Sequence, residues 1–567
     1  MISEDPLFAQ NVAGVLVESL GSQNTTPGFS PVEKFPQAKF APYWNLSYVW
    51  NPAGSGIMWE RYNFPVFLLS AESTSFVQEI VSKNEKHNDA YTKDVAEFDL
   101  AMHTTNAGTH DSESCLKEQT CLPLGGYSVW SSLPPINVSS VKRRPILLAM
   151  ASQDSASFFR DQSLGADSPL SGLIAMLVAV DALSHVDGLD ELQKQLLFVV
   201  FTGEAWGYLG SRRFLLELDL NTDAVNGLNS TMIEQVLEIG SVGKGLGQGV
   251  TTFYAHPGGS SSLTKEILSA FQTASDSLGS DNVKVKTADA SNPGVPPSSL
   301  MSFIRKNSSI SGVVLEDFDT SFTNRLYHSH MDDLSNINSS SVAAAAALVA
   351  RALYVLATGD ATLNLIELNS IKVNVSLVEE LVRCLLTCEP GLSCGVVKDF
   401  INPSNACPSH YVGVFVDSPA NIQYPQYADD TSRFIWNFLA DKTSIPKKNF
   451  SSCTGGCSNS EVCVGAETNS GGRCVISTTR YVPAYSTRLK FEGGSWLLMP
   501  ANASDPMESV DPVWTESYWN TIGLRVYAVQ SSAYDRLVLI SGVVLTVAAY
   551  IAAIAIRTCL SKAIKQD

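Results

Sequence analysis

The sequence predicts an α/β fold, a mostly parallel sheet covered by helices, followed by one transmembrane helix. Residues 145–151 and 195–202 are short, fully apolar runs, and the apolar stretch 170–184 between them has the length of a helix. This order of strand, helix and strand predicts parallel neighbours, and ligands in such folds bind beyond the carboxyl ends of the strands. Residues 537–556 carry no charge, and 20 helical residues at about 1.5 Å each span a membrane core of about 30 Å.

The other elements follow from the same patterns. Residues 1–140 are rich in Pro, Asn, Ser and aromatic side chains, with short strand-like pieces at 14–17 and 64–69 and one helix around 75–86. Further elements are expected at 232–239, 262–277 (helix), 310–315 (strand), 340–358 (helix) and 377–386 (helix).

Charge excludes one class of partner and orients the membrane segment. Acidic residues outnumber basic residues by 56 to 38, for a net charge of −18, so the chain repels nucleic acid. Arg557, Lys562 and Lys565 follow the apolar segment, and this basic excess predicts a cytoplasmic C-terminus. A buried core helix is the alternative for 537–556, but an uninterrupted apolar run of this length favours a span.

Cysteines and sequons agree with a lumenal or extracellular location for the part before that segment. Ten cysteines precede it and are expected to form disulfides, whereas Cys559 follows it. They are Cys115, Cys121, Cys384, Cys388, Cys394, Cys407, Cys453, Cys457, Cys463 and Cys474. N-x-S/T sequons, which are candidate N-glycosylation sites, begin at Asn24, Asn45, Asn137, Asn229, Asn307, Asn338, Asn374, Asn449 and Asn502.

The Cys-rich segment 453–474 has two interpretations. Zinc is the alternative to disulfides, but the spacing lacks the two CxxC pairs of a zinc ribbon, and the compartment is oxidising. We expect a bridge between Cys457 and Cys463, nested inside one between Cys453 and Cys474.

The remaining cysteines support one local prediction. Cys115 and Cys121 are close enough in sequence for a bridge that closes a small loop. The sequence leaves open how the other four pair: Cys384, Cys388, Cys394 and Cys407.

The N-terminus does not have the pattern of a signal peptide. MISEDPLFAQNVAGVLVESLG has two acids near its front and no basic region followed by a long apolar run. We therefore expect the sequence to be incomplete at its N-terminus.

Polar stretches lie where an α/β hydrolase would carry its site. They are ASQDS (151–155), GADSPLSG (165–172), FTGEAWGYLGS (201–211), LEIG (237–240) and YHSHMDD (327–333). A hydrolytic di-zinc centre needs two His, several carboxylates and a separate Glu that takes a proton from the metal-bound water. These stretches supply carboxylates but an incomplete set, and the Asp332-Asp333 pair is read as a solvated turn.

In order and spacing, these stretches resemble the co-catalytic zinc aminopeptidase family. That family carries H-x-D-S, an Asp entering the next helix, Glu-Glu before G-x-x-G-S, a later Asp and a final His. The resemblance places Asp154 at the retained Asp, Asp167 at the bridging Asp and Glu204 at the proton-shuttling Glu. His328 matches the final His, with His330 as the alternative.

The same resemblance shows which ligands are lost. Ser152 stands where the first His belongs, Ala205 replaces the second Glu, and Glu238 lies where an Asp is usual. A hydroxyl and a methyl group do not replace an imidazole and a carboxylate at about 2 Å from zinc. We therefore expect a vestigial pocket that holds no metal or other cofactor and has no catalytic residue.

Longer motifs resemble the nicastrin family, the large glycoprotein subunits of γ-secretase. They are FPQAKFAPY, GIMWERYNFPVF, GEAWGYLGS, VPPSSL, SGVVLEDF and DPVWTESYW, followed by one membrane helix and a short basic tail. The resemblance runs from about residue 35 to the C-terminus. It implies a bilobed ectodomain in complex with presenilin, which carries the catalytic aspartates, and with two small polytopic subunits. The family usually reads D-Y-I-G-S where residues 207–211 are GYLGS, so no role of that Asp is carried over.

The resemblance also implies the domain organisation. The expected segments are a partial small lobe with an inter-lobe segment (1–140), a degenerate aminopeptidase-like domain (141–360), the rest of the large lobe with the Cys-rich segment and a membrane-proximal stem (361–535), the transmembrane helix (537–556) and a cytoplasmic tail (557–567).

The function that the resemblance implies is non-catalytic support of an intramembrane aspartyl protease. The chain would aid assembly and stability, and its ectodomain would recognise or sterically gate stubs of type I membrane proteins. It is expected as a single-pass type I protein of the endoplasmic reticulum, Golgi, endosomal and plasma membranes. The alternatives are an active zinc aminopeptidase-like ectoenzyme and a membrane receptor unrelated to proteolysis.

Glu204 has two competing interpretations. With Trp206 and Tyr208 it forms a candidate substrate-binding group, in which the carboxylate pairs with a substrate α-ammonium for about 1–3 kcal/mol. Alternatively, Glu204 caps the helix that follows it, a contribution of about 1 kcal/mol.

Overall fold

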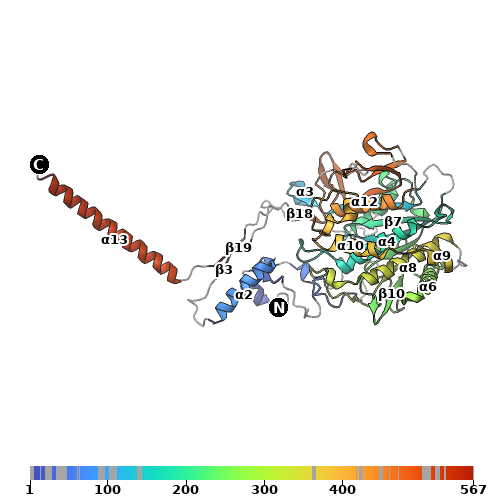
Figure 1. Cartoon of the computed structure of the whole chain (residues 1–567), viewed down its shortest axis with the longest axis horizontal. Coiled ribbons are helices and arrows are strands. Elements are labelled where there is room, and N and C mark those ends of the chain that lie inside the picture. The colour runs from blue at the N-terminus through green and yellow to red at the C-terminus, as the bar shows by residue number, and fades with distance from the viewer. Residues whose placement is uncertain are drawn as a thin grey trace. The chain divides into compact units, whose positions relative to one another are not determined.

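A computed structural model of the chain describes residues 6–12, 14–19, 29–32, 48–60, 62, 64–86, 96–100, 111–136, 143–359, 365–416, 418–419, 425–445, 451–458, 460–469, 471–500, 513–517, 524–528 and 532–565. The chain forms two compact units, which are coloured along the sequence in Figure 1. The large unit holds residues 1–9, 24–62 and 105–517, and the small unit holds 10–23, 63–104 and 518–567.

A nine-stranded sheet organises the large unit. Its order is β11 (Val283–Thr287), β10 (Val250–Pro257), β12 (Ser311–Glu316), β8 (Ile233–Ile239), β6 (Ile146–Ser152), β7 (Gln195–Phe201), β5 (Gly125–Leu133) and β15 (Arg480–Tyr485), with β9 (Leu246–Gly247) paired to β10. The neighbours β12, β8, β6 and β7 are parallel, as predicted. Antiparallel pairs flank them, so the sheet is mixed and parallel at its centre.

The apolar runs of β6 and β7 are continuous because both faces of these strands are buried. Leu147, Ala149 and Ala151 of β6 belong to one hydrophobic cluster, whereas alternate residues such as Leu148 and Met150 belong to a second cluster. All five side chains have no exposed surface. Successive strand residues point to opposite faces, so helices on both sides of the sheet are required to bury them.

Helices supply those two covers. The first cluster takes residues from α4 (Gly172–Ser184), α6 (Ser262–Ser277), α8 (Ser339–Thr358), α10 (Val375–Leu386) and α12 (Asp430–Lys442), which gather around the sheet in Figure 1. The second cluster takes residues from α5 (Leu209–Leu220) and α7 (Leu300–Lys306). The helices expected at 170–184, 262–277, 340–358 and 377–386 are thus confirmed to within a few residues.

The local sequence explains where these helices begin and end. The Asn338 Oδ1 accepts from the Ser340 N–H at 2.8 Å and caps α8, and Gly359 ends the same helix with a φ of 65°. The Ser261 Oγ caps α6 by accepting from the Thr264 N–H at 3.0 Å.

Short elements complete the large unit. They are α3 (Ser112–Lys117), β4 (Cys121–Pro123), α9 (Leu365–Ser370), α11 (Gly395–Lys398), β13 (Glu461–Val464), β14 (Arg473–Ile476), β16 (Leu489–Glu492), β17 (Ser495–Leu498) and β18 (Thr515–Ser517). Strand β18 pairs antiparallel with β4, and β13 with β14 and β16 with β17 form hairpins. Strand β18 therefore holds the end of the large unit close to its Cys115–Cys121 loop.

The described residues of the small unit form two strand pairs and two long helices. Strands β1 (Val15–Val17) and β2 (Val66–Leu68) are parallel and match the pieces expected at 14–17 and 64–69. Strands β3 (Ala96–Leu100) and β19 (Leu524–Ala528) are antiparallel. The helices are α2 (Ala71–Lys86) and α13 (Ser532–Ala563), while α1 (Pro6–Asn11) crosses the boundary between the units.

Helix α13 contains the predicted membrane segment. Among the described residues, three helical stretches are long and apolar enough to cross a membrane, at 166–184, 339–358 and 532–563. The first two are 89% and 72% buried within the large unit, so they are core helices of the α/β fold. Helix α13 is 0% buried, which leaves its apolar surface for a membrane.

Five disulfides join the ten cysteines before α13. The predicted bridge between Cys115 and Cys121 is present. The pairs that the sequence left open are Cys384–Cys394 and Cys388–Cys407.

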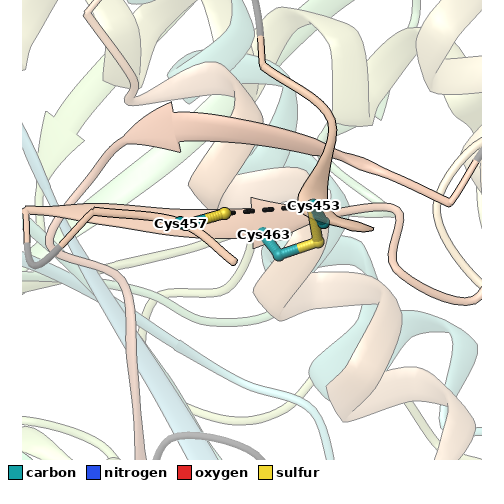
Figure 2. Close-up of side chains that lie close together, drawn as sticks. All are labelled: Cys453, Cys457 and Cys463. Carbon is teal, nitrogen blue, oxygen red and sulfur yellow. Dashed lines mark hydrogen bonds between the residues drawn. A yellow bond between two sulfur atoms is a disulfide. The ribbon is translucent and has the colours of Figure 1, made fainter. Parts of the chain in front are cut away.

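The nested pairing expected for the Cys-rich segment is wrong. Cys453 pairs with Cys463 (Figure 2). Cys457 pairs with Cys474. The reason is the β13–β14 hairpin, which sets Cys463 and Cys474 opposite each other and brings the preceding loop alongside both. The spacing of cysteines in the sequence does not indicate which residues of the two strands lie opposite each other.

Candidate functional site

A small pocket lies at the carboxyl ends of the central parallel strands. Its wall includes Ser152, Asp154, Glu204, Ala205, Tyr208, Glu238, Glu316 and His328, and its volume is about 80 Å³. Strands β6, β7, β8 and β12 end at this edge of the sheet, where α/β folds bind ligands. The pocket has room for a few water molecules or one amino group, because a water needs roughly 10–15 Å³ of such space.

Two glycines shape the turn that carries Glu204. Gly203 and Gly207 have φ values of 79° and 85°, which L-residues with side chains rarely adopt, and the 3-10 helix Glu204–Trp206 lies between them. Tyr208 follows with a φ of 59° and leads into α5. This tight turn points Glu204 back toward the strand ends.

Asp154 holds that turn in place. Its two carboxylate oxygens accept from the backbone N–H groups of Glu204 at 2.9 Å and Ala205 at 3.0 Å. Burial raises the pKa of Asp154 to about 6, although the two backbone hydrogen bonds act against the rise. Asp154 is therefore a positioning residue for the turn.

Glu204 is buried, with 6% of its surface exposed. Its Oε1 accepts from the Ser211 N–H at 2.8 Å, in the first turn of α5, so the capping interpretation of Glu204 is supported. Its Oε2 has no hydrogen-bond partner among the described residues. Burial raises the pKa of Glu204 to about 8, so the carboxyl is largely neutral at pH 7.

Glu238 plays the same structural part on the opposite side of the pocket. Its Oε1 accepts from the Ser299 N–H at 2.9 Å and its Oε2 from the Leu300 N–H at 2.7 Å, which anchors the start of α7. Burial raises the pKa of Glu238 to about 7. Both oxygens that could bind a metal already accept hydrogen bonds.

His328 lies in the pocket wall, whereas His330 lies against Phe29 and Phe159. His328 stacks on Tyr327 with ring centres 3.9 Å apart, and its Nδ1 has no hydrogen-bond partner among the described residues. Burial lowers the pKa of His328 to about 3, so the ring is neutral. Of the two candidates for the final ligand position, the structure brings only His328 to the pocket.

The residues of the pocket do not fit a di-zinc centre. Ser152 and Ala205 line the wall where the resemblance requires a His and a Glu, and the oxygens of Asp154 and Glu238 are held by backbone N–H groups. Within the described part of the chain, no three His, Cys, Asp or Glu ligand atoms from this pocket lie within 4.8 Å of one another. A zinc ion needs three or four such ligands at about 2 Å.

Asp167 belongs to a second buried group of acids behind the pocket. The Asp332 Oδ1 accepts from the Asp167 N–H at 3.1 Å, and the Asp167 Oδ1 accepts from the Gly243 N–H at 3.1 Å. Burial, with Asp317 and Asp332 nearby, raises the pKa of Asp167 well above its ordinary value. Asp167 therefore ties neighbouring loops together.

The interpretation of Asp332 as part of a solvated turn is wrong. Asp332 has no exposed surface, and it accepts from the side-chain amides of Asn324 at 3.1 Å and Asn336 at 2.7 Å. These partners come from a loop that folds back on itself around the carboxylate. Asp333 caps the short helix 334–336 and is partly exposed, as a turn residue is expected to be.

Trp206 points away from the pocket. Its ring packs against Trp59, Tyr411 and Trp514, with ring centres 5.7, 5.6 and 5.2 Å away. Tyr208 does line the pocket beside Glu204. The candidate group Glu204, Trp206 and Tyr208 is therefore divided, and Trp206 forms part of an aromatic cluster beside the turn.

Several residues of the pocket wall were not predicted from the sequence. Glu316 ends β12, and its Oε2 accepts from the Ser241 N–H at 2.6 Å. The signal for Glu316 was present, because SGVVLEDF places an acid directly after an apolar run, as in the other strands. Phe318, Phe322 and Tyr327 had no comparable signal.

Four of the nine sequons fall on described residues. Asn307, Asn338 and Asn374 are exposed and Asn229 is half-buried. In each, the Oδ1 accepts from a backbone N–H two or three residues later, so the side chain forms a local turn or helix cap. The sequons at Asn24, Asn45, Asn137, Asn449 and Asn502 lie outside the described residues.

The fold and site define a class of protein, a membrane-anchored α/β lobe with a pocket of structural acids. Family models match two parts of the chain, the nicastrin small lobe at residues 4–104 and the nicastrin large lobe at residues 145–354. Nicastrin of Arabidopsis thaliana is 60% identical over 571 residues, which cover 100% of this chain and 84% of that protein. The chain belongs to the nicastrin family.

Distant relatives and a solved structure agree with this assignment. Nicastrin of Homo sapiens is 26% identical over 593 residues, which cover 94% of this chain and 79% of that protein. The crystal structure of the γ-secretase component nicastrin superposes with a TM-score of 0.73 at 24% identity, covering 91% of this chain and 86% of the other. This superposition shows that the two chains share a fold.

Proposed function

We propose that this chain is a non-catalytic subunit of a γ-secretase complex, in which presenilin carries the catalytic aspartates and two small polytopic subunits complete the assembly. Membership of the nicastrin family supports this, since a family member of known structure is described as a γ-secretase component. The apolar helix α13 supports a single-pass anchor within membranes of the secretory and endosomal system and the cell surface.

One observation carries the non-catalytic assignment. The carboxylate oxygens of Asp154 and Glu238 accept hydrogen bonds from four backbone N–H groups. Ser152 and Ala205 occupy the positions of two lost ligands. Without a metal to lower the pKa of a bound water, a neutral Glu204 has no hydroxide-forming partner for peptide hydrolysis. The acids of the pocket therefore serve to hold the surrounding backbone.

Steric gating of substrates is the role that this geometry supports best. A pocket of about 80 Å³ admits a few water molecules or a small group such as an amine, and a largely neutral Glu204 offers a hydrogen bond rather than an ion pair. A folded lobe above the membrane would instead exclude membrane proteins with long ectodomains and admit short stubs. The partnerless Oε2 of Glu204 favours a second candidate, recognition of a substrate α-ammonium.

Purification of the full chain from native membranes in mild detergent tests the assembly. We expect a polytopic aspartyl protease with two small polytopic proteins to co-purify. Absence of an aspartyl protease would contradict the proposal and favour a receptor unrelated to proteolysis.

The same preparation tests the absence of catalysis by this chain. We expect sub-stoichiometric zinc after dialysis and no release of amino acids from dipeptides supplied with zinc. Near-stoichiometric zinc together with dipeptide cleavage would establish an active aminopeptidase instead.

Replacement of Glu204 in the reconstituted complex separates the two substrate roles. The Glu204→Gln variant keeps the Ser211 hydrogen bond. Steric gating predicts that the complex containing this variant cleaves short-ectodomain substrates at the wild-type rate. Recognition of the α-ammonium predicts a lower kcat/KM for Glu204→Gln with intact assembly, and equal loss for Glu204→Ala.

A further inference from the structure

Two disulfides of the Cys-rich segment lie against each other. The Sγ atoms of Cys453 and Cys457 are 3.9 Å apart, although each is bonded to a different partner (Figure 2). The Sγ atoms of Cys453, Cys457 and Cys463 all lie within 4.8 Å of one another. Because all three sulfurs are in disulfides, none is a thiolate that could bind a metal.

The β13–β14 hairpin places the fourth cysteine, Cys474, opposite Cys463 in the backbone pairing. Cys463 and Cys474 are directly opposed in this antiparallel pair. The Cys474 N–H donates to the Ser451 carbonyl at 2.9 Å, away from β13, so the two cysteines form a non-hydrogen-bonded pair. Cα atoms in such pairs are about 4.5 Å apart, inside the range of about 4.4–6.8 Å that a disulfide spans.

We propose that these four cysteines form a thiol–disulfide exchange site, at which a thiol such as glutathione or a protein dithiol converts the bridges to Cys453–Cys457 and Cys463–Cys474. The sulfurs of Cys453 and Cys457 already lie close together, and Cys463 and Cys474 are already opposite each other in the backbone pairing. The exchange therefore needs side-chain rotation but keeps the register of the hairpin. The proposal is independent of the pocket around Glu204.

The exchange proceeds in three steps and leaves the oxidation state unchanged. The attacking thiolate bonds to the Cys453 sulfur and releases the Cys463 thiolate. The Cys463 thiolate then attacks the Cys474 sulfur across the hairpin and releases the Cys457 thiolate. Finally, the Cys457 thiolate attacks the Cys453 sulfur and releases the original thiol.

Exposure selects Cys453 as the entry point. Cys453 and Cys457 are half-buried, whereas Cys463 and Cys474 have 8% and 0% of their surface exposed. An external thiol therefore reaches the loop side of the pair, and the later steps take place inside the protein.

The exchange would free one segment of the surface. In the present pairing both bridges join the segment Ser451–Ser458 to the hairpin. After exchange, backbone contacts of Ser451 with Cys474 and of Ser452 with Arg473 would remain. Arg473 and Val464 also line a cavity of about 520 Å³, so the freed segment borders a second hollow of the large unit.

The first experiment maps disulfides in the wild-type full chain in detergent. The chain is incubated with reduced and oxidised glutathione, quenched with acid, alkylated, digested and examined by mass spectrometry. We expect Cys453–Cys457 and Cys463–Cys474 to appear together in a one-to-one ratio with glutathione, and neither to appear without thiol. Retention of the original bridges alone, or formation of Cys453–Cys474 with Cys457–Cys463, would overturn the proposal.

The chain contains an internal control for that experiment. Cys384–Cys394 and Cys388–Cys407 are also two bridges close in sequence. Among the described residues, Glu380, Cys384 and Cys394 have ligand atoms within 4.8 Å of one another, and the sulfurs of Cys388 and Cys407 are not part of that close group. These four cysteines should keep their pairing under the same conditions.

The second experiment uses Cys457→Ser, which leaves one of the four cysteines without a partner. The exchange site predicts that the Cys474 thiolate attacks Cys463, so that Cys463–Cys474 forms and Cys453 becomes the free thiol. Free Cys453 alkylates in the folded protein, because it is half-buried. The proposal would be contradicted if Cys453–Cys463 stayed intact and the buried Cys474 could be alkylated only after denaturation. Cys388→Ser is the matched control and should leave Cys384–Cys394 intact.

Discussion

The acids of the pocket act on the backbone around them. Asp154 and Glu238 each accept hydrogen bonds from two backbone N–H groups. Glu204 accepts one such bond, and its other oxygen has no hydrogen-bond partner among the described residues. Burial raises the pKa of all three carboxyls. A raised carboxyl pKa means that the folded chain binds more protons than the unfolded chain between the two pKa values.

The pH dependence of stability gives a test of this description at Glu204. Ionisation of Glu204 affects stability between its unfolded pKa of 4.5 and its folded pKa of about 8. Its contribution to stability is complete below pH 4.5 and is lost as the pH rises through about 8, because the charged form is disfavoured in the folded chain.

Glu204→Gln should flatten that dependence, because glutamine stays neutral at every pH. Between about pH 5 and 8, the unfolding free energy of the wild type should fall more steeply than that of the variant, by up to about 1.4 kcal/mol per pH unit. Chemical denaturation of the full chain in detergent measures both slopes. Asp161→Asn, at an exposed carboxylate, is the control. Parallel slopes for wild type and Glu204→Gln would show that Glu204 is ionised in the folded chain.

Sequence reasoning located part of the site and missed part of it, for physical reasons. Glu204, Glu238 and His328 meet because parallel strand ends share one edge of a sheet, which the apolar runs already imply. Trp206 points away from the pocket because of the backbone conformation at Gly203 and Gly207. The order of residues in the sequence does not indicate such a side-chain direction.

At the scale of elements, strand β5 was not predicted from the sequence, and it contains buried hydroxyl groups. Ser131 of β5 is fully buried, and its Oγ lies 2.6 Å from the hydroxyl oxygens of Thr443 and Thr479. Serines in GGYSVWSSL obscure the apolar pattern, and their partners lie more than 300 residues away in the chain. The wholly apolar strands β6 and β7 needed no such partners and were predicted to within a residue.

The contact between α4 and β8 yields a prediction about packing. A Cβ on Gly172, at the start of α4, would lie 2.2 Å from the Gly240 carbonyl oxygen and 2.4 Å from that of Ile239. Backbone atoms cannot move aside as a flexible side chain can, so Gly172→Ala should destabilise the chain by about 1–3 kcal/mol.

Denaturation of the full chain measures this change against a matched glycine. Gly279 has no atom within 4 Å of its added Cβ and no positive φ, so Gly279→Ala should stay within about 0.5 kcal/mol of the wild type. Equal stability of the two variants would mean that α4 does not approach β8 as closely as described.

At the scale of the whole molecule, hydropathy alone does not identify the membrane helix. Helices at 166–184 and 339–358 are also apolar enough to span, and burial within the α/β lobe separates them from α13. The sequence favoured the C-terminal segment because of its unbroken length and the basic residues after it.

A topology experiment tests the orientation of the chain. In sealed microsomes, the proposed type I orientation would place the large unit in the lumen, so external protease should remove the short basic tail after α13 and spare the rest. Endoglycosidase should lower the apparent mass, and Asn307→Gln, Asn338→Gln and Asn374→Gln should each remove one glycan. Digestion of the large unit, with no glycan at these exposed sites, would reverse the assigned orientation.

Strand β18 gives the large unit a mechanical connection to the rest of the chain. Ser112 and Leu124 hydrogen-bond to the carbonyls of Val513 and Trp514, and Arg160 pairs with Glu516 at 2.7 Å. Strand β18 pairs antiparallel with β4, and the Cys115–Cys121 bridge closes the loop that leads into β4. Trp514, which directly precedes β18, packs against Trp206, two residues from Glu204, so a displacement of β18 would be passed through these two rings to the turn that carries Glu204.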